Sequence, residues 1–227
     1  MGLTARYRSP AGLPATIPIF PLGGALLLPR GQLPLNIFEP RYLTMIDHAL
    51  SNERIIGMVQ PDSEAGLAQE RDPGAKPDIY AIGCAGRITS YAETNDNRLF
   101  ITLTGLCRFR IGHELDAATP YRQATVSYDE FAGDLKPGSG ADEIDRDRLL
   151  EVLKAYLSAH NLQADWDAIR ASSNESLVNS LSMISPYGPA EKQALLEAKT
   201  LDERNQLLIA LTEIALVQST ETDPTVQ

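Results

Sequence analysis

Short apolar runs separated by turn-forming residues occupy most of the first half of the chain, from Thr16 to Tyr128. Within residues 98–104, Leu and Ile alternate with Phe and Thr, which is the period of a β-strand that buries one face. Six or seven such runs are present, and one segment of this half, beginning at Pro40, has apolar residues at helical spacing. A partly closed antiparallel β-barrel with one helix leaves few strand edges exposed in such a set.

The spacing of apolar residues changes to that of helices after residues 131–141, whose three glycines and one proline indicate a linker. Residues 142–218 contain four amphipathic segments, and Thr200-Leu-Asp-Glu203 before the last one has the spacing of a helix capping box. We therefore predict an α+β protein, with a barrel subdomain at residues 15–130 followed by a small C-terminal α-helical bundle.

Three segments are expected to be mobile. Residues 1–14 and 219–227 are predicted to be flexible tails. Residues 61–78 contain three prolines, two glycines and seven charged residues. Because this segment has little apolar area to bury, we predict a mobile hairpin loop.

The chain has 227 residues, 30 acidic and 20 basic side chains and a formal net charge of −10. Residues 1–113 carry 11 basic and 10 acidic side chains, a net of +1, whereas residues 114–227 carry 9 and 20, a net of −11. This balance argues against a nucleic-acid partner, because phosphates are bound by clustered Lys and Arg. The acidic half is either a solvated surface or a face for a basic partner.

The compartment follows from the apolar runs and the cysteines. None of the apolar runs approaches the ~20 residues needed to span a bilayer, and the N-terminal segment lacks the apolar core of a signal peptide. Cys84 and Cys107 lie in strand-like runs and are interpreted as reduced, buried side chains rather than a redox pair. The sequence therefore predicts a cytoplasmic protein with no membrane partner.

The motifs of common catalytic sites are absent from the sequence. It contains no phosphate-binding G-x-x-x-x-G-K-[ST] loop, no dinucleotide-binding G-x-G-x-x-G and no G-x-S-x-G elbow. His48, His113 and His160 are scattered and lack other ligands at metal spacing, so we expect no metal site and no cofactor. A nucleophilic pair of a cysteine with a histidine stays open, although no spacing favours it.

Two charges and two aromatic rings surround the start of the predicted helix, in the run Phe38-Glu39-Pro40-Arg41-Tyr42. In a structural interpretation, Glu39 complements the helix dipole, Tyr42 joins the buried stripe and Arg41 pairs with Glu39 or with a strand carboxylate. In a functional interpretation, the same side chains border a groove that receives an extended polypeptide segment.

Several segments resemble the N-terminal substrate-binding domain of Lon proteases and together extend over about residues 15–218. The Phe-Glu-Pro-Arg-Tyr run after a proline-rich strand is the most specific of them. The similar segments are Ile17-Pro-Ile-Phe-Pro-Leu22, Leu27-Leu-Pro29, Leu33-Pro-Leu-Asn-Ile-Phe-Glu-Pro-Arg-Tyr42, Ile82-Gly83, Leu103-Thr-Gly105, Arg108-Phe-Arg-Ile111 and Glu191 to Leu208.

The resemblance implies a PUA-like barrel followed by a helical bundle, and a role in recognising protein substrates. The ATPase and Ser–Lys peptidase modules of Lon proteases are not recognisable in this sequence, so we expect no enzymatic activity. Our main hypothesis is a non-catalytic module that binds exposed peptide segments or partner proteins, with an adaptor or regulatory role in proteolysis. A sheet edge would add a strand from the client. The candidate binding residues are Phe20, Phe38, Glu39, Arg41, Tyr42 and Arg108.

Two alternatives stay open. One is an enzyme that uses the barrel mouth as a small-molecule pocket. The other is an RNA-binding protein, because PUA-like barrels often bind RNA and Arg41, Arg87, Arg108 and Arg110 could form a local basic patch. In its strand-like run, Arg108 or Arg110 is either solvated or forms a buried ion pair with Glu39 across the barrel.

Overall fold

The computed structural model describes residues 7–69, 76–94, 96 and 98–222. The chain divides into two compact units, and neither is continuous in sequence. Met1–Pro137 and Pro186–Leu196 form the first, here called the sheet unit, and Gly138–Ser185 and Glu197–Gln227 form the second, here called the helical unit. The predicted helical subdomain at residues 142–218 thus differs from the structure, in which 11 of these residues, 186–196, belong to the sheet unit.

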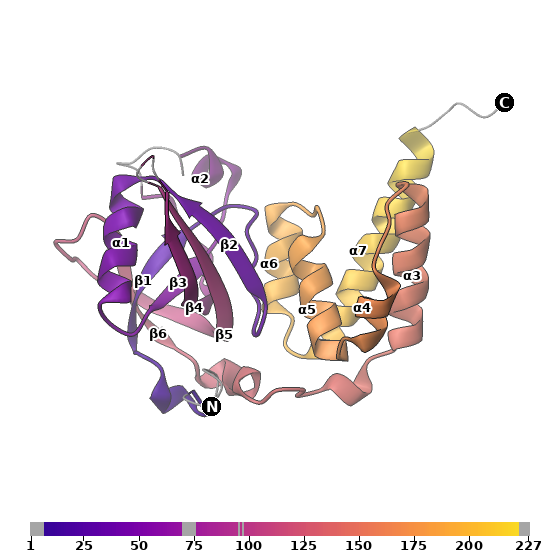
Figure 1. The fold of residues 1–227 in the computed structure, drawn as a ribbon, viewed down its shortest axis with the longest axis horizontal. Helices are drawn as coiled ribbons and strands as arrows, with labels where there is room; N and C mark the ends of the chain where they lie inside the picture. Colours follow the sequence, from indigo (N-terminus) through magenta and orange to yellow (C-terminus); the bar gives the residue numbers. More distant parts are fainter. Residues whose placement is uncertain (1–6, 70–75, 95, 97, 223–227) are drawn as a thin grey trace. The chain divides into compact units, whose positions relative to one another are not determined.

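Within its described residues, the sheet unit contains six strands (Figure 1). The elements in chain order are η2 (Pro10–Gly12), β1 (Thr16–Pro21), β2 (Gln32–Ile37), α1 (Pro40–Leu50), β3 (Ile55–Val59), α2 (Glu64–Gln69), β4 (Ile82–Glu93), β5 (Leu99–Glu114), β6 (Arg122–Ser127), η3 (Asp129–Leu135) and α6 (Pro189–Glu197).

The strand order is β2-β5-β4-β3-β1-β6, and β5 also pairs with β6. This additional pairing bends the sheet back on itself and makes a partly closed barrel, as the strand pattern predicted. The expectation that all strands are antiparallel is wrong for one pair, because β1 runs parallel to β3. The connection between them contains β2 and α1, which is long enough for the crossover that a parallel pair requires. The predicted α+β class is confirmed.

Strand β5 organises the barrel because its 16 residues contact three other strands. Its first part pairs with β2, its last part with β6, and its other edge with β4. The change of partner follows Gly105, where a Cβ atom would lie 2.0 Å from the carbonyl oxygen of Leu28. Phe109, fully buried further along β5, fills the barrel interior, and a Cβ atom on Gly83 would lie 2.6 Å from its Cζ.

A buried ion pair attaches η3 to β5. The Arg108 side chain, on a residue that is 4% exposed, donates two hydrogen bonds of 2.9 Å to the Asp134 carboxylate. It donates a third, of 3.0 Å, to the carbonyl of Leu196 and lies over the ring of Phe131 at 4.6 Å. Arg110, two residues further on, pairs at the surface with Glu130. Of the two alternatives for these arginines, the pair with Glu39 is therefore wrong, since both pair with carboxylates of η3.

Helix α6 is held on the sheet unit by buried amides. The side chain of Gln60, which is 2% exposed, accepts a hydrogen bond from the Gly24 N–H and donates to Gln193 Oε1 and to the Pro189 carbonyl. Gln193 in turn donates to the Ile82 carbonyl. Buried polar groups need such partners, so this network fixes where the helix lies on the sheet.

Two expectations of mobility need correction within the described residues. The described part of the N-terminal segment is packed, because Tyr7 and Leu13 are buried and Arg87 donates a 2.9 Å hydrogen bond to the Tyr7 hydroxyl. The predicted loop at residues 61–78 contains the short helix α2. The rest of these expectations, at residues 1–6, 70–75 and 223–227, lies outside the described residues.

The helical unit consists of η4 (Ala141–Glu143), α3 (Arg146–Ala159), α4 (Trp166–Ala171), α5 (Asn174–Ile184) and α7 (Leu201–Thr222). Helix α7 packs against α3 and α5. The predicted capping box is present, since the Glu203 N–H donates to the Thr200 hydroxyl and the Glu203 carboxylate accepts from the Lys199 N–H. Helix α4 was not predicted, and α7 continues through residues expected to fray. No helix in the described ranges combines the length and apolarity of a membrane span.

The role of the buried ion pair between Arg108 and Asp134 can be tested by comparison with the exposed pair between Arg110 and Glu130. We expect Arg108→Leu to lower the free energy of unfolding by about 3–5 kcal/mol, because Asp134 would lose its buried counter-charge. Arg110→Leu is the matched control, since its pair with Glu130 has side chains 48% and 47% exposed; its loss should cost about 0–1 kcal/mol. Urea unfolding followed by circular dichroism measures both. Equal losses would contradict the assigned role of Arg108.

Candidate functional site

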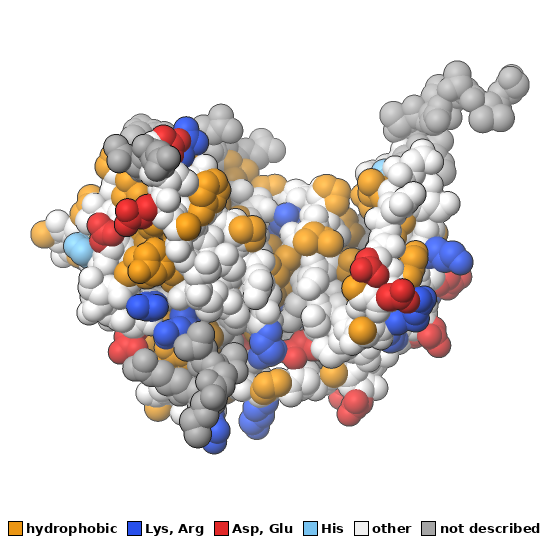
Figure 2. All heavy atoms as spheres, viewed as in Figure 1, with side chains coloured by type: hydrophobic (Ala, Val, Ile, Leu, Met, Phe, Trp, Pro, Cys, Tyr) orange, Lys and Arg blue, Asp and Glu red, His pale blue; other side chains and the backbone are white. Residues whose placement is uncertain are grey.

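A groove of about 520 Å³ lies in the sheet unit, beside the ends of β1 and β2 and the start of α1. Most of the residues that line it are apolar, and Glu39 is the one charged side chain among the described residues that line it. Figure 2 shows apolar side chains exposed over the same part of the sheet unit. The lining residues are Phe20, Leu22, Gly23, Gly24, Leu35, Asn36, Ile37, Phe38, Glu39, Tyr42, Leu67 and Pro189.

Aromatic packing positions one wall of the groove. Because side chains alternate along a strand, Phe20 points to the side of β1 opposite to Ile19 and Pro21. Its ring packs against Tyr42 of α1 with 4.2 Å between centroids. Arg41 lies over the same Tyr42 ring at 4.6 Å and pairs with Glu39 at 2.9 Å. The first turn of α1 is therefore fixed against β1.

Another part of the groove wall depends on the Gln60 network. Gly24 and Pro189 both line the groove, and both have a backbone group hydrogen-bonded to the Gln60 side chain. Lys192 adds a 2.8 Å hydrogen bond to the Gly24 carbonyl. The groove is thus made from segments that are far apart in sequence, at Gly24 and Pro189, joined by one buried amide.

A strand edge borders the groove. Strand β2 is terminal in the sheet, and among the described residues it pairs only with β5. Terminal strands present unpaired N–H and C=O groups, and Pro34 within β2 is of the kind that such edges tolerate. Leu35, Asn36 and Ile37, the last residues of β2, also line the groove. Backbone hydrogen-bonding groups and apolar side chains are therefore available side by side.

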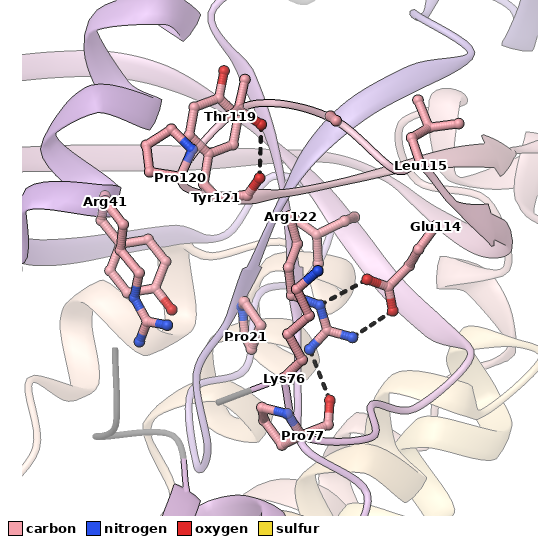
Figure 3. A pocket seen from close by; sticks show the side chains of 13 residues that line it. Pro21, Arg41, Lys76, Pro77, Glu114, Leu115, Thr119, Pro120, Tyr121 and Arg122 are labelled. Atoms are coloured by element: carbon pink, nitrogen blue, oxygen red, sulfur yellow. Dashed lines mark hydrogen bonds and ion pairs between the residues drawn. The ribbon is translucent and has the colours of Figure 1, made fainter. Parts of the chain in front are cut away.

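A second, smaller cavity of about 90 Å³ lies at the barrel end where β5 finishes and β6 begins (Figure 3). Arg41, Lys76, Arg122 and Glu114 contribute charges to its wall. The Arg122 guanidinium pairs with both oxygens of Glu114 and donates a 2.7 Å hydrogen bond to the Pro77 carbonyl. Tyr42 lines both cavities.

The predicted site residues divide between these features. Four of them, Phe20, Phe38, Glu39 and Tyr42, line the groove. Arg41 lines the smaller cavity. Arg108 is in neither, because it is buried against Asp134. The residues that sequence reasoning missed are Leu22, Leu35, Ile37, Leu67 and Pro189, together with Gln60 beneath them.

The basic residues considered for RNA binding are each engaged locally. Arg41, Arg108 and Arg110 pair with Glu39, Asp134 and Glu130, respectively. Arg87 donates to the Tyr7 hydroxyl. These contacts leave the four side chains dispersed and mostly neutralised, whereas a nucleic-acid site needs clustered positive charge.

The described cysteines and histidines are not arranged as a nucleophilic pair or as a set of metal ligands. Cys84 and Cys107 are buried thiols, and burial, with a smaller effect of the Asp134 charge, raises the pKa of Cys107 to about 12. His48 hydrogen-bonds the Tyr121 hydroxyl at 2.7 Å rather than a thiol. Within the same residues, no three His, Cys, Asp or Glu side chains gather as metal ligands would.

Comparison with known proteins identifies relatives of the chain. The family described as "ATP-dependent protease La (LON) substrate-binding domain" matches residues 16–213. A Lon protease of Anaeromyxobacter dehalogenans (strain 2CP-C) is 32% identical over 114 residues, which are 50% of this chain and 13% of that protein. A Lon protease of Syntrophus aciditrophicus (strain SB) is 28% identical over 86% of this chain and 21% of its own length. The chain therefore spans a small part of these relatives.

Two solved structures have a similar fold. The N-terminal domain of the Mycobacterium avium complex Lon protease superposes with a TM-score of 0.63 at 17% identity, covering 87% of this chain and 98% of that one. A Lon N-terminal domain protein from Xanthomonas campestris has a TM-score of 0.59 at 21% identity, covering 86% and 97%. At these identities the likeness concerns the fold.

Gln60 provides a test of how the groove wall is held. We expect Gln60→Leu to remove the hydrogen bonds that Gln60 makes with the Gly24 N–H and with Gln193 Oε1, and to cost about 1–3 kcal/mol of stability. Hydrogen exchange should accelerate at Gly24 and along α6. Gln206→Leu, at an exposed position of α7, is the control and should change neither. Unchanged exchange in α6 would refute the anchoring role of Gln60.

The thiol of Cys107 is predicted to be unreactive while the protein is folded. Since its raised pKa keeps it protonated up to about pH 12, alkylation by iodoacetamide at pH 8.5 should not occur. Alkylation should become complete in urea. Mass spectrometry measures the extent, and a Cys107→Ser variant separates this thiol from Cys84. Rapid alkylation of the native protein would contradict the described burial.

Proposed function

The chain belongs to the family of Lon substrate-binding domains, and from this premise we propose that it is a non-catalytic module that binds exposed, extended segments of other polypeptides. The observation that carries the proposal is the apolar groove bordered by the terminal strand β2. The family description supplies the class of ligand, a protein substrate.

Strand addition explains how such a site would hold clients of different sequence. A segment laid along β2 would form backbone hydrogen bonds that do not depend on its side chains. Alternate side chains would then point to the same side, where Phe20, Phe38 and Tyr42 offer apolar and aromatic contacts. Because the backbone hydrogen bonds come from β2 and the side-chain contacts from the apolar groove, we expect affinity for extended, uncharged segments.

The electrostatics of the groove favour an uncharged polypeptide over RNA. Glu39 is the charged side chain of the described lining, and Arg41 neutralises it at 2.9 Å. A phosphate backbone would find no compensating cluster of cations along this groove. Unfolded or partly folded proteins expose apolar segments that match it.

An adaptor or regulatory role in proteolysis follows from the same premise. A module that holds an unfolded segment would present it to a protease or withhold it. The two buried thiols are consistent with a reducing compartment, and we propose the cytoplasm as the place of action.

The binding test uses a fluorescein-labelled, uncharged decapeptide that alternates Val or Phe with Ser. We expect anisotropy titration to give a dissociation constant of about 10–100 μM, weakened about tenfold by Phe38→Ser through lost apolar contact. Phe38 is 61% exposed, so the substitution should leave the fold intact. Tyr91→Ser is the matched control, because Tyr91 is 52% exposed and does not line the groove. Absence of binding to the wild type would refute the proposal.

A second peptide separates strand addition from apolar contact alone. N-methylation at alternate residues removes the donors on one edge of the peptide and leaves its side chains unchanged. If the peptide pairs with β2, methylation of one of the two alternating sets should abolish binding, and methylation of the other should be tolerated. Equal binding of both methylated peptides would exclude pairing with β2.

A further inference from the structure

Basic residues predominate among the charged side chains that line the smaller cavity. Of the four charged side chains that the described residues contribute to it, three are basic, namely Arg41, Lys76 and Arg122. Figure 3 shows Arg41 of α1 on one side of the cavity and the paired Arg122 and Glu114 on the other. We propose that this cavity binds a carboxylate, specifically the free C-terminal carboxylate of the polypeptide held by the groove. The assignment rests on the proposed function and deepens it.

The charge of the cavity fits one negative group. Glu39 neutralises Arg41, and Glu114 neutralises Arg122. The remaining cation is Lys76, whose ammonium has no ion pair or hydrogen bond to another described residue. A single carboxylate would therefore complete the charge balance of the wall, with charge-assisted hydrogen bonds from Lys76 and from the remaining N–H groups of Arg122.

The apolar residues of the cavity wall indicate which kind of C-terminal residue would bear the carboxylate. Ile19, Pro21, Pro77, Leu115 and Pro120 face the same space as the cations. At about 90 Å³ the cavity is well below the roughly 300–1,000 Å³ of a site for a drug-sized ligand. A small apolar residue with its α-carboxylate, such as a C-terminal Ala or Val, matches both the size and the mixed chemistry.

The position of Tyr42 connects the cavity to the groove. Its ring lines both, Arg41 lines the cavity, and Glu39 lines the groove. Tyr42 is therefore a wall that the two cavities share, and a chain whose last residue occupies the cavity would turn around this ring to reach the groove. The carboxylate of Glu114 lies in the cavity wall and opposes a dianion, which favours a carboxylate over a phosphate monoester.

The first test uses a single-residue probe, so that binding to the cavity is measured independently of binding to the groove. The probe is N-acetyl-L-alanine, titrated to tens of millimolar while backbone amide shifts are followed by NMR; N-acetyl-L-alanine amide and inorganic phosphate are the comparison probes. We expect saturable shifts at Tyr121 and Arg122 with the acid, none with the amide and weaker ones with phosphate. Lys76→Gln should abolish the shifts, whereas Lys154→Gln, at an exposed lysine of α3, should not. Equal shifts with acid and amide, or stronger shifts with phosphate, would overturn the proposal.

The second test uses the decapeptide with a C-terminal Ala, as the free acid and as the amide. We expect the wild type to bind the acid about tenfold more tightly, and Lys76→Gln to abolish that preference without weakening the amide. Equal affinities would overturn the carboxylate site and leave the groove proposal intact. A preference that survives Lys76→Gln would place the carboxylate elsewhere and also overturn it. Binding of neither peptide, with normal N-acetylalanine shifts, would refute the groove and retain a free-carboxylate site.

Discussion

The buried guanidinium of Arg108 joins three parts of the sheet unit that are far apart in sequence. It comes from β5, its charge is balanced by Asp134 of η3, and its third hydrogen bond goes to the Leu196 carbonyl in α6. Removing such a charge from water costs several kcal/mol unless every donor finds a partner. The chain therefore has to bring η3 and α6 to β5 at the same time. Because α6 also supplies Pro189 and Gln193, the wall of the groove depends on an ion pair located elsewhere in the unit.

Features that depend on neighbouring residues were predictable from the sequence. The alternation within residues 99–104 identified a strand, and Pro40 marked the start of α1. The Thr200 capping box lies where its spacing placed it. Four groove residues were found for the same reason, since three of them cluster at the start of α1 and Phe20 belongs to the adjacent proline-rich strand.

Features that depend on distant partners were not predictable. A period of two shows which face of a strand is buried but not which strand lies beside it, so the parallel pairing of β1 with β3 was missed. The pattern of α6 is the same whether it packs on other helices or on a sheet, and its place in the sheet unit was missed as well. Arg108 or Arg110 was considered as a partner of Glu39, as was Arg41; Arg41 is two residues from Glu39 and pairs with it at a far smaller entropic cost.

One strand and one ring contribute to the walls of both cavities. Ile19 and Pro21 of β1 line the small cavity, whereas Phe20 and Leu22 line the groove, because successive side chains of a strand point to opposite sides. Tyr42 borders both and is held by Phe20 at 4.2 Å and by Arg41 at 4.6 Å. The ring also keeps Arg41 beside Glu39. The positive charge of Arg41, which lines the small cavity, is thus neutralised by the negative charge of Glu39, which lines the groove. In the proposed binding mode, the apolar contact with the body of a peptide and the ionic contact with its end would be separated by this single side chain, whose place is set by the packing of α1 on β1.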